Sequence, residues 1–320
     1  MDSRTHIASS ADRRADRIRG ALVGLATGDA VGTTVEFSPP GSFPPVTEMT
    51  GGGPFRLKAG QWTDDTSMAL CLAESLVTCG GMSAHDQMTR WVRWWRDGHL
   101  SSTGRCFDIG NATRAALARF ESNGDPCAGS TDPNTAGNGS LMRLAPVAMW
   151  FADRPVEAVD ACGESSRTTH AARAAVDACR WFGGLLVGAM HGATKDELLA
   201  PVYSPPGVDR ALWTLHPEIE RVANGSWLER EPPAIRGSGW VVHTLEAALW
   251  AFARTENFRD GLLAVVNLGE DADTTGAVYG QLAGAYYGES GIPAEWRQRL
   301  ALWETIDRLA SALAPASLDG

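Results

Sequence analysis

The sequence lacks three features that would place the protein in other classes. No apolar run approaches the roughly 20 residues of a membrane-spanning helix, and one of the longest, WFGGLLVGAM, covers only 181–190. The six cysteines include no CxxC pair, so their spacing indicates neither a zinc site nor a disulfide framework. Acids outnumber bases by 38 to 28 and give a formal net charge of -10, which disfavours nucleic acid as the main partner.

The N-terminus also lacks the order of a secretory signal, because charges are scattered through residues 1–19. We therefore expect a cytoplasmic protein with reduced cysteines and no membrane partner. Cys71, Cys79, Cys162 and Cys179 lie in helix-like runs and are expected to be small core residues.

Strand signals are scarce, since Val, Ile and Thr do not cluster in alternating runs. Apolar residues instead recur at three- and four-residue spacing. This pattern predicts an all-α protein with helices over 17–30, 66–78, 84–96, 111–120, 155–162, 170–190, 241–254, 258–268, 276–288 and 295–313.

Two regions, 38–62 and 201–239, are rich in proline and glycine, and the second holds a short helix-like piece at 208–223. Neither is simple enough in composition to be a disordered linker. We interpret both as ordered insertions on a single domain that spans 1–320, with enough apolar residues (44%) for a sizeable core.

Glycine recurs at every fourth position in three of the predicted helices. The positions are Gly20, Gly24, Gly28 and Gly32, then Gly184, Gly188 and Gly192, then Gly276, Gly280, Gly284 and Gly288. Four-residue spacing keeps these glycines near one helix face. Because an interior glycine costs roughly 0.8–1 kcal/mol relative to alanine, the repetition predicts close backbone approach at packed helices or beside a ligand. Gly32, Gly192 and Gly288 are instead expected to lie past helix ends as caps.

Two adjacent acids, Asp64 and Asp65, lie between Thr63 and Thr66 at the start of a predicted helix. Adjacent like charges repel, so their position needs an explanation. One is a helix start, with Thr63 as the N-cap and acids that favour the helix dipole. The other is a hard-cation site built from carboxylate and hydroxyl oxygens.

A second cluster, NLGEDADTTGAVYG at 267–280, repeats this chemistry with Asp271, Asp273 and Thr274 before another helix. One cap needs one oxygen, so two such clusters weaken the capping explanation. Their oxygen ligands favour Mg²⁺, Mn²⁺ or Ca²⁺ over zinc. Four or five carboxylates from separate segments are enough to hold two ions.

Two further acids fit the same site. Glu36 lies among apolar residues just before the proline-rich region, and Asp108 lies in CFDIGNATRAAL just before a helix. The alternatives are an ordinary surface position for Glu36 and a helix cap for Asp108 or Asn111.

A turn of small residues, Gly137-Asn138-Gly139-Ser140, precedes another apolar run, and amides in such a turn bind phosphate. Asn-Gly turns are common, so the signal is weak by itself. His170 stands at the start of a long helix, where a cap or a core role is the alternative.

These segments occur together in order: GALVGLATGDAVGTTVEF, TGGGPFRLKAGQWTDDTSMAL, FDIGNATR, AGNGSLMR, TTHA and NLGEDADTTGAVYGQLAGAYYG. With them the chain resembles the ADP-ribosylglycohydrolase family, and within it the nitrogenase reductase-activating branch, over a core of about 17–300. The resemblance implies a compact single-domain orthogonal helical bundle. It also implies two divalent cations, Mg²⁺ or Mn²⁺, at the base of a cleft.

The resemblance gives roles to the residues already selected. It implies metal ligands at Thr63, Asp64, Asp65, Asp271, Asp273 and Thr274. It implies catalytic acids at Glu36 and Asp108, and contacts with ADP-ribose at Gly137, Asn138, Gly139, Ser140 and His170.

Two departures from the family pattern stand out. Glu270 occupies a position where the family pattern has a second glycine, and the 201–239 region matches poorly. An extra carboxylate at Glu270 could change metal preference or leaving-group fit, or point to solvent. If 201–239 borders the cleft, it affects target selection.

The implied activity is metal-dependent removal of ADP-ribose from modified protein side chains, with ADP-ribose as the product. Metals would hold the ribose hydroxyls and activate water, Glu36 and Asp108 would share the acid and base roles, and the 137–140 amides would position the pyrophosphate. The branch resemblance favours ADP-ribosyl-arginine. Serine-linked or small-molecule ADP-ribose, a non-catalytic ADP-ribose-binding protein and a pyrophosphate-cleaving phosphohydrolase are the alternatives.

Overall fold

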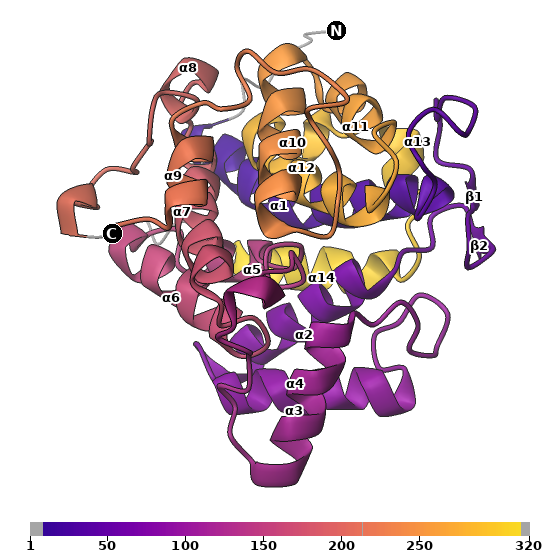
Figure 1. Cartoon of the computed structure of the whole chain (residues 1–320), viewed down its shortest axis with the longest axis vertical. Helices are drawn as coiled ribbons and strands as arrows, with labels where there is room; N and C mark the ends of the chain where they lie inside the picture. Colours follow the sequence, from indigo (N-terminus) through magenta and orange to yellow (C-terminus); the bar gives the residue numbers. More distant parts are fainter. Residues whose placement is uncertain (1–8, 213, 315–320) are drawn as a thin grey trace, which may run out of the picture.

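The computed structural model describes residues 9–212 and 214–314, so the ends of the predicted domain, 1–8 and 315–320, lie outside the described residues. The predicted all-α class is confirmed (Figure 1). The helices are α1 Ser10–Gly32, α2 Asp64–Cys79, α3 Ala84–Asp97, α4 Asn111–Asn123, α5 Ala145–Trp150, α6 Pro155–Arg167, α7 Arg173–Met190, α8 Lys195–Leu198, α9 Pro217–Ala223, α10 Val241–Arg254, α11 Phe258–Val266, α12 Ala272–Tyr287, α13 Ala294–Arg297 and α14 Trp303–Leu313.

Helices α1 and α12 form the centre of the molecule, and every residue of α12 from Ala272 to Ala285 is buried. A Cβ atom on Gly24 would lie 2.1 Å from the carbonyl oxygen of Gly280, and one on Gly28 would lie 2.0 Å from that of Gly276. No side chain fits in these contacts. The predicted close backbone approach is confirmed for this pair, around which α2 and α14 pack on one side and α10 and α11 on another (Figure 1).

The remaining glycines behave differently. Gly32 does not cap α1, because it is the last helical residue, with a φ of -68°, and Thr33 is the C-cap, so the cap interpretation is wrong at this position. A Cβ there would lie 2.3 Å from the Ala272 carbonyl oxygen. Gly192 and Gly288 follow helix ends with φ of +88° and +80°, as expected of caps. Gly184 and Gly188 face the side chains of Pro205 and Tyr203 rather than another helix backbone.

Several predicted boundaries need correction. Helix α1 begins at Ser10, where Ser9 and Asp12 form a capping box that extends the helix seven residues earlier than expected. The predicted helix over 295–313 is two helices, because Leu302 adopts a φ of +52° between them. Helix α5 was not predicted, since six residues are too few for a periodic signal.

Four 3₁₀ turns, Thr33–Val35, Pro133–Thr135, Arg210–Leu212 and Glu289–Gly291, and a minimal sheet complete the described loops. Strands β1 (Gly51–Gly52) and β2 (Leu57–Lys58) form an antiparallel pair inside the predicted 38–62 insertion. The 208–223 piece is helical only in its second half, at α9, with a 3₁₀ turn at Arg210–Leu212.

All six cysteines are unpaired, as expected, but Cys79 is exposed rather than in the core because it lies in the last turn of α2. None of the helices within the described part of the chain is long and apolar enough to cross a membrane.

Candidate active site

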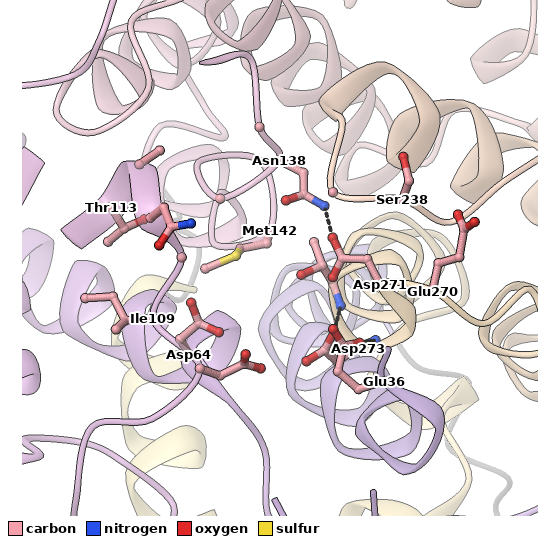
Figure 2. A pocket seen from close by; sticks show the side chains of 18 of the residues that line it. Glu36, Asp64, Ile109, Thr113, Asn138, Met142, Ser238, Glu270, Asp271 and Asp273 are labelled. Atoms are coloured by element: carbon pink, nitrogen blue, oxygen red, sulfur yellow. Dashed lines mark hydrogen bonds between the residues drawn. The ribbon is translucent and has the colours of Figure 1, made fainter. Parts of the chain in front are cut away.

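A pocket with a volume of about 750 Å³ opens beside the first turns of α2, α4 and α12 (Figure 2). Most of the predicted site residues line it: Glu36, Asp64, Asp108, Gly137, Asn138, Gly139, His170, Asp271, Asp273 and Thr274. Thr63, Asp65 and Ser140 are buried and do not line the pocket. Residues from six separate segments therefore meet at one place.

The first turn of α2 is held by Asp29, which lies in the last two turns of α1. Its Oδ1 accepts hydrogen bonds from the amide and the hydroxyl of Thr63, both at 2.9 Å. Its Oδ2 accepts from the amide of Thr66 at 3.0 Å and from the Thr66 hydroxyl at 2.7 Å. Thr63 itself makes no capping hydrogen bond, so the simple capping explanation is wrong here.

The same holds for the other two helices at the pocket. Asp271 is the N-cap residue of α12, yet its side chain does not cap the helix and its Oδ2 accepts from Asn138 Nδ2 at 2.7 Å. Helix α4 is preceded by Gly110 with no side-chain cap, so neither Asp108 nor Asn111 serves as one. Capping thus leaves the acids of the pocket unexplained.

Carboxylate oxygens gather in two groups that share Asp273. One oxygen each from Asp29, Asp65 and Asp273 lie within 4.8 Å of one another, and so do one oxygen each from Glu36, Asp271 and Asp273. Asp64 belongs to neither group, although it lines the pocket beside them (Figure 2). A shared carboxylate between two groups is an arrangement that can bridge two cations.

The acids of the pocket perturb one another strongly. Burial, followed by the charge of Asp273, raises the pKa of both Asp29 and Asp271 to about 7. Burial and the neighbouring aspartates also hold the pKa of Asp64 and Asp65 well above the usual range. The carboxylates cannot all ionise near neutral pH unless positive charge is added.

The residues present fit a hard divalent cation. Asp65 is 1% exposed, and its Oδ1 atom has no hydrogen-bond partner within the described chain. A buried carboxylate oxygen without a partner is costly, and a cation is a natural partner for it. The surrounding donors are all oxygens, which suits Mg²⁺ or Mn²⁺.

Glu36 and Asp108 reach the pocket from separate segments of the chain. Glu36 is 4% exposed, so the alternative of a surface position is wrong, and its Oε2 accepts from the Asp273 amide at 3.4 Å. Asp108 adopts a φ of +60°, which is unusual for a residue other than glycine. Burial, and then the charge of Asp64, raises the pKa of Asp108 to about 11. Burial and Asp273 also raise that of Glu36.

The Gly137–Ser140 turn contributes backbone and one amide side chain. The amide N–H groups of Gly137 and Asn138 donate to Thr135 and Gly239, so they are already engaged within the protein. The Ser140 hydroxyl lies 2.7 Å from that of Ser166, on the buried side. The amides of Gly139 and Ser140 have no backbone acceptor among the described residues.

His170 closes the pocket beside this turn. Arg143, fully buried, donates to the Thr169 hydroxyl at 2.7 Å, and that hydroxyl lies 2.8 Å from His170 Nδ1. Because arginine only donates, the Thr169 hydroxyl oxygen accepts from Arg143; when the hydroxyl donates its own proton to Nδ1, the ring carries its hydrogen on Nε2. Burial, followed by the Arg143 charge, lowers the pKa of His170 to about 3. The ring is therefore neutral, and it lies next to Gly137 and Gly139.

Asp29, Thr66 and Arg143 were not assigned to the site by sequence. Asp29 carried a usable signal, since it is the only acid in the glycine- and alanine-rich second half of α1, residues 20–32, all of which are buried. Arg143 carried a similar one, as a cation within the apolar run LMRLAPVAM. Thr66 gave no signal apart from its neighbours.

The sequence model of ADP-ribosylglycohydrolase matches residues 10–319. The chain belongs to the ADP-ribosylglycohydrolase family. The prediction of an ADP-ribosyl glycosidase is confirmed at the level of this family.

The names of several relatives state an activity. The chain is 47% identical to the "ADP-ribosylarginine hydrolase Tri1" of Pseudomonas putida, covering 93% of this chain and 78% of that protein. It is 32% identical to the "ADP-ribosyl-[dinitrogen reductase] glycohydrolase" of Rhodospirillum rubrum, covering 95% and 98%. A solved structure, titled "ADP-ribosylglycohydrolase-related protein complex", matches with a TM-score of 0.83 and 47% identity, over 96% of this chain and 99% of that one.

Proposed function

We propose that this chain is a divalent-cation-dependent hydrolase that removes ADP-ribose from modified arginine side chains of proteins. The observation that carries the proposal is the two clusters of carboxylate residues beside the pocket, which have Asp273 in common. The arginine linkage is supported by the name of the Pseudomonas putida relative and by a Serratia proteamaculans relative of the same name at 43% identity.

Two Mg²⁺ or Mn²⁺ ions would be held by Asp64, Asp65, Asp271 and Asp273, with the hydroxyls of Thr63 and Thr274. When bound, such ions supply Lewis-acid chemistry: they fix ribose hydroxyls and lower the pKa of a water molecule. Asp29 orients this set, because both of its oxygens already accept hydrogen bonds from α2.

The reaction breaks the bond between ribose C1 and a guanidine nitrogen and forms a bond from water oxygen to C1. We assign the acceptance of the water proton to Glu36, which lies beside Asp271 and Asp273. The pKa of Glu36 falls toward that of a proton acceptor once positive charge is held by these neighbours. We assign the proton that goes to the leaving nitrogen to Asp108, because the largest cause that raises its pKa is burial, which a bound cation does not remove.

ADP-ribose would be held by the turn at 137–140 and by His170. The unpaired amides of Gly139 and Ser140 are suitable donors for the pyrophosphate, as is His170 Nε2. Asn138 contributes indirectly, since its side chain orients Asp271. We further propose that 1–320 acts as one domain, and the unpaired cysteines support a reducing, cytoplasmic setting.

The test is an activity panel of arginine-, serine- and cysteine-linked ADP-ribosyl peptides with Mg²⁺, Mn²⁺ or a chelator. We expect release of intact ADP-ribose from the arginine-linked peptide, and loss of release with the chelator. Release of AMP would instead assign a pyrophosphate-cleaving activity. Binding of ADP-ribose without any release would assign a non-catalytic relative, and faster release from the serine peptide would reverse the linkage preference.

A further inference from the structure

The two departures from the family pattern in the sequence meet in space. Arg236, from the 201–239 region, forms an ion pair with Glu270: Nη2 lies 2.5 Å from Oε1 and Nε lies 3.3 Å from Oε2. This is a two-point contact between a guanidinium and a carboxylate, the arrangement that such groups favour. Both residues line the pocket.

The backbone holds Glu270 in this position at an energetic cost. Its φ is +59°, a conformation that costs a residue with a side chain on the order of 1 kcal/mol or more. Two backbone hydrogen bonds secure it. The Phe37 amide donates to the Glu270 carbonyl oxygen at 2.7 Å, and the Glu270 amide donates to the Ser38 carbonyl oxygen at 2.8 Å. The acid is therefore fixed beside the segment that follows Glu36.

The carboxylate of Glu270 is separate from the cation-binding acids. It belongs to neither group of converging oxygens. Figure 2 shows it beside Asp271 at the edge of the labelled acids, directed away from Asp273 and Glu36. Its side chain is 23% exposed, so a molecule in the pocket can reach it.

Arg236 and Glu270 also line a second hollow, which contains Pro40, Pro232, Ile235, Trp250 and Leu268. The ion pair thus forms a wall between this hollow and the pocket. A substrate joined at one end to ADP-ribose and at the other to a polypeptide has to leave the pocket at its edge, and Glu270 lies on that edge next to Asp271.

We propose that Glu270 binds the guanidinium of the ADP-ribosylated arginine, and that Arg236 occupies this carboxylate until the substrate replaces it. The Arg236 side chain is 52% exposed and can therefore swing away. This inference rests on the proposed function, because it names the group that determines the linkage specificity of the same pocket. Glu270 acts as a specificity residue rather than as an acid or base.

The two residues then have opposite effects. Glu270→Gln removes the charge that attracts the guanidinium, and Arg236→Ala removes the internal competitor. We expect kcat/KM for the arginine-linked peptide to fall about 10-fold in Glu270→Gln and to rise a few-fold in Arg236→Ala. With the serine-linked peptide both variants should stay within about 3-fold of the unmodified protein, because that leaving group carries no guanidinium.

A binding measurement separates this inference from the proposed activity. Agmatine, a guanidinium probe, is titrated into the ADP-ribose-saturated protein by calorimetry, with butylamine as the ammonium control. We expect agmatine to bind Arg236→Ala more tightly than the unmodified protein, and Glu270→Gln more weakly. This order supports the inference even if no peptide is hydrolysed, and equal affinities would overturn it even if hydrolysis is found.

A matched pair provides the structural control. Arg96 and Glu121 form an ion pair of the same length, 2.5 Å, with similar exposure, and neither lines the pocket. Arg96→Ala and Glu121→Gln should change neither kinetics nor agmatine binding. Loss of activity in both pocket variants with both linkages would mean that the pair only shapes the wall. Loss of ADP-ribose affinity in Arg236→Ala would assign Arg236 to the pyrophosphate, and either result would overturn the proposal.

Discussion

Asp29 and Thr66 are joined by two hydrogen bonds to one carboxylate oxygen, Oδ2, from the amide at 3.0 Å and from the hydroxyl at 2.7 Å. The other oxygen serves Thr63 in the same way. The Asp29 carboxylate at the end of α1 therefore accepts hydrogen bonds from two amides and two hydroxyls at the start of α2. Asp65 is not needed as an acceptor for these amides, and its side chain faces the other acids.

Replacement of Asp29 by Asn should destabilise the protein by about 1–3 kcal/mol, because the Asn amide nitrogen would face buried donors that lose their acceptor. Hydrolysis should fall strongly, since Asp65 loses its orientation. Urea unfolding and initial rates measure the two effects. Asp12→Asn, at the exposed start of α1, is the control and should retain full activity. An Asp29→Asn protein of unchanged stability would show that these hydrogen bonds contribute nothing.

Gly24→Ala should cost more than most single substitutions in this protein. The new Cβ would lie 2.1 Å from the Gly280 carbonyl oxygen, and two central helices would have to separate. Overpacking of this kind costs typically 1–3 kcal/mol or more, which a thermal or urea unfolding curve resolves. Gly184→Ala is the matched control, since its Cβ would meet the Pro205 side chain at 3.2 Å. Equal stability of the two variants would contradict the central role of the α1–α12 contact.

Glycine spacing made this contact predictable, because a repeated cost has to be offset by something that only glycine allows. The partner was not predictable: nothing in the sequence distinguishes a helix backbone, which Gly24 meets, from the Tyr203 ring, which Gly188 meets. The acid clusters were likewise found from residue type and spacing. The convergence of Asp29 on α2, and of Arg236 on Glu270, depends on tertiary packing and could not be found that way.

The cation-free protein should become less stable as pH rises, which is the opposite of the usual effect of buried or paired carboxylates with lowered pKa values. Asp29 and Asp271 have a pKa of about 7 in the folded protein against an ordinary 3.8, so between these values the folded state binds more protons than the unfolded state. Stability therefore falls as pH rises through this window. We expect Tm in the presence of chelator to drop between about pH 5 and pH 7, and added Mg²⁺ or Mn²⁺ to raise it more at the upper end of this range.

The control for this effect is Asp271→Asn, which removes one of the titrating groups and should flatten the slope. A Tm that rises with pH in the chelated protein would contradict the assignment of raised pKa values to this cluster.

Thr169→Val should weaken the binding of ADP-ribose by about 10-fold, because the hydroxyl that joins Arg143 to His170 Nδ1 is lost. The His170 tautomer is then no longer fixed, and NMR of the ring nitrogens should show a mixture. Thr169→Ser keeps the hydroxyl and should restore both affinity and tautomer. If Thr169→Val retains a single Nε2–H tautomer and normal affinity, the hydroxyl does not position the ring.

Glu36→Gln and Asp108→Asn separate chemistry from structure. Each acid is buried among other carboxylates, so its amide should leave Tm unchanged or raise it. If the acid transfers a proton, kcat should fall by about 10²–10⁴-fold. Near-normal ADP-ribose affinity in the same variant would then locate the loss in the chemical step, whereas lost affinity would indicate a role in holding cation or ligand. We expect the larger loss of kcat in Asp108→Asn, because Asp108 lies outside both groups of converging oxygens and has no role there to mask its chemistry. If both amides turn over at nearly the normal rate, neither side chain moves a proton, and a water molecule activated without either acid becomes the better account of the reaction.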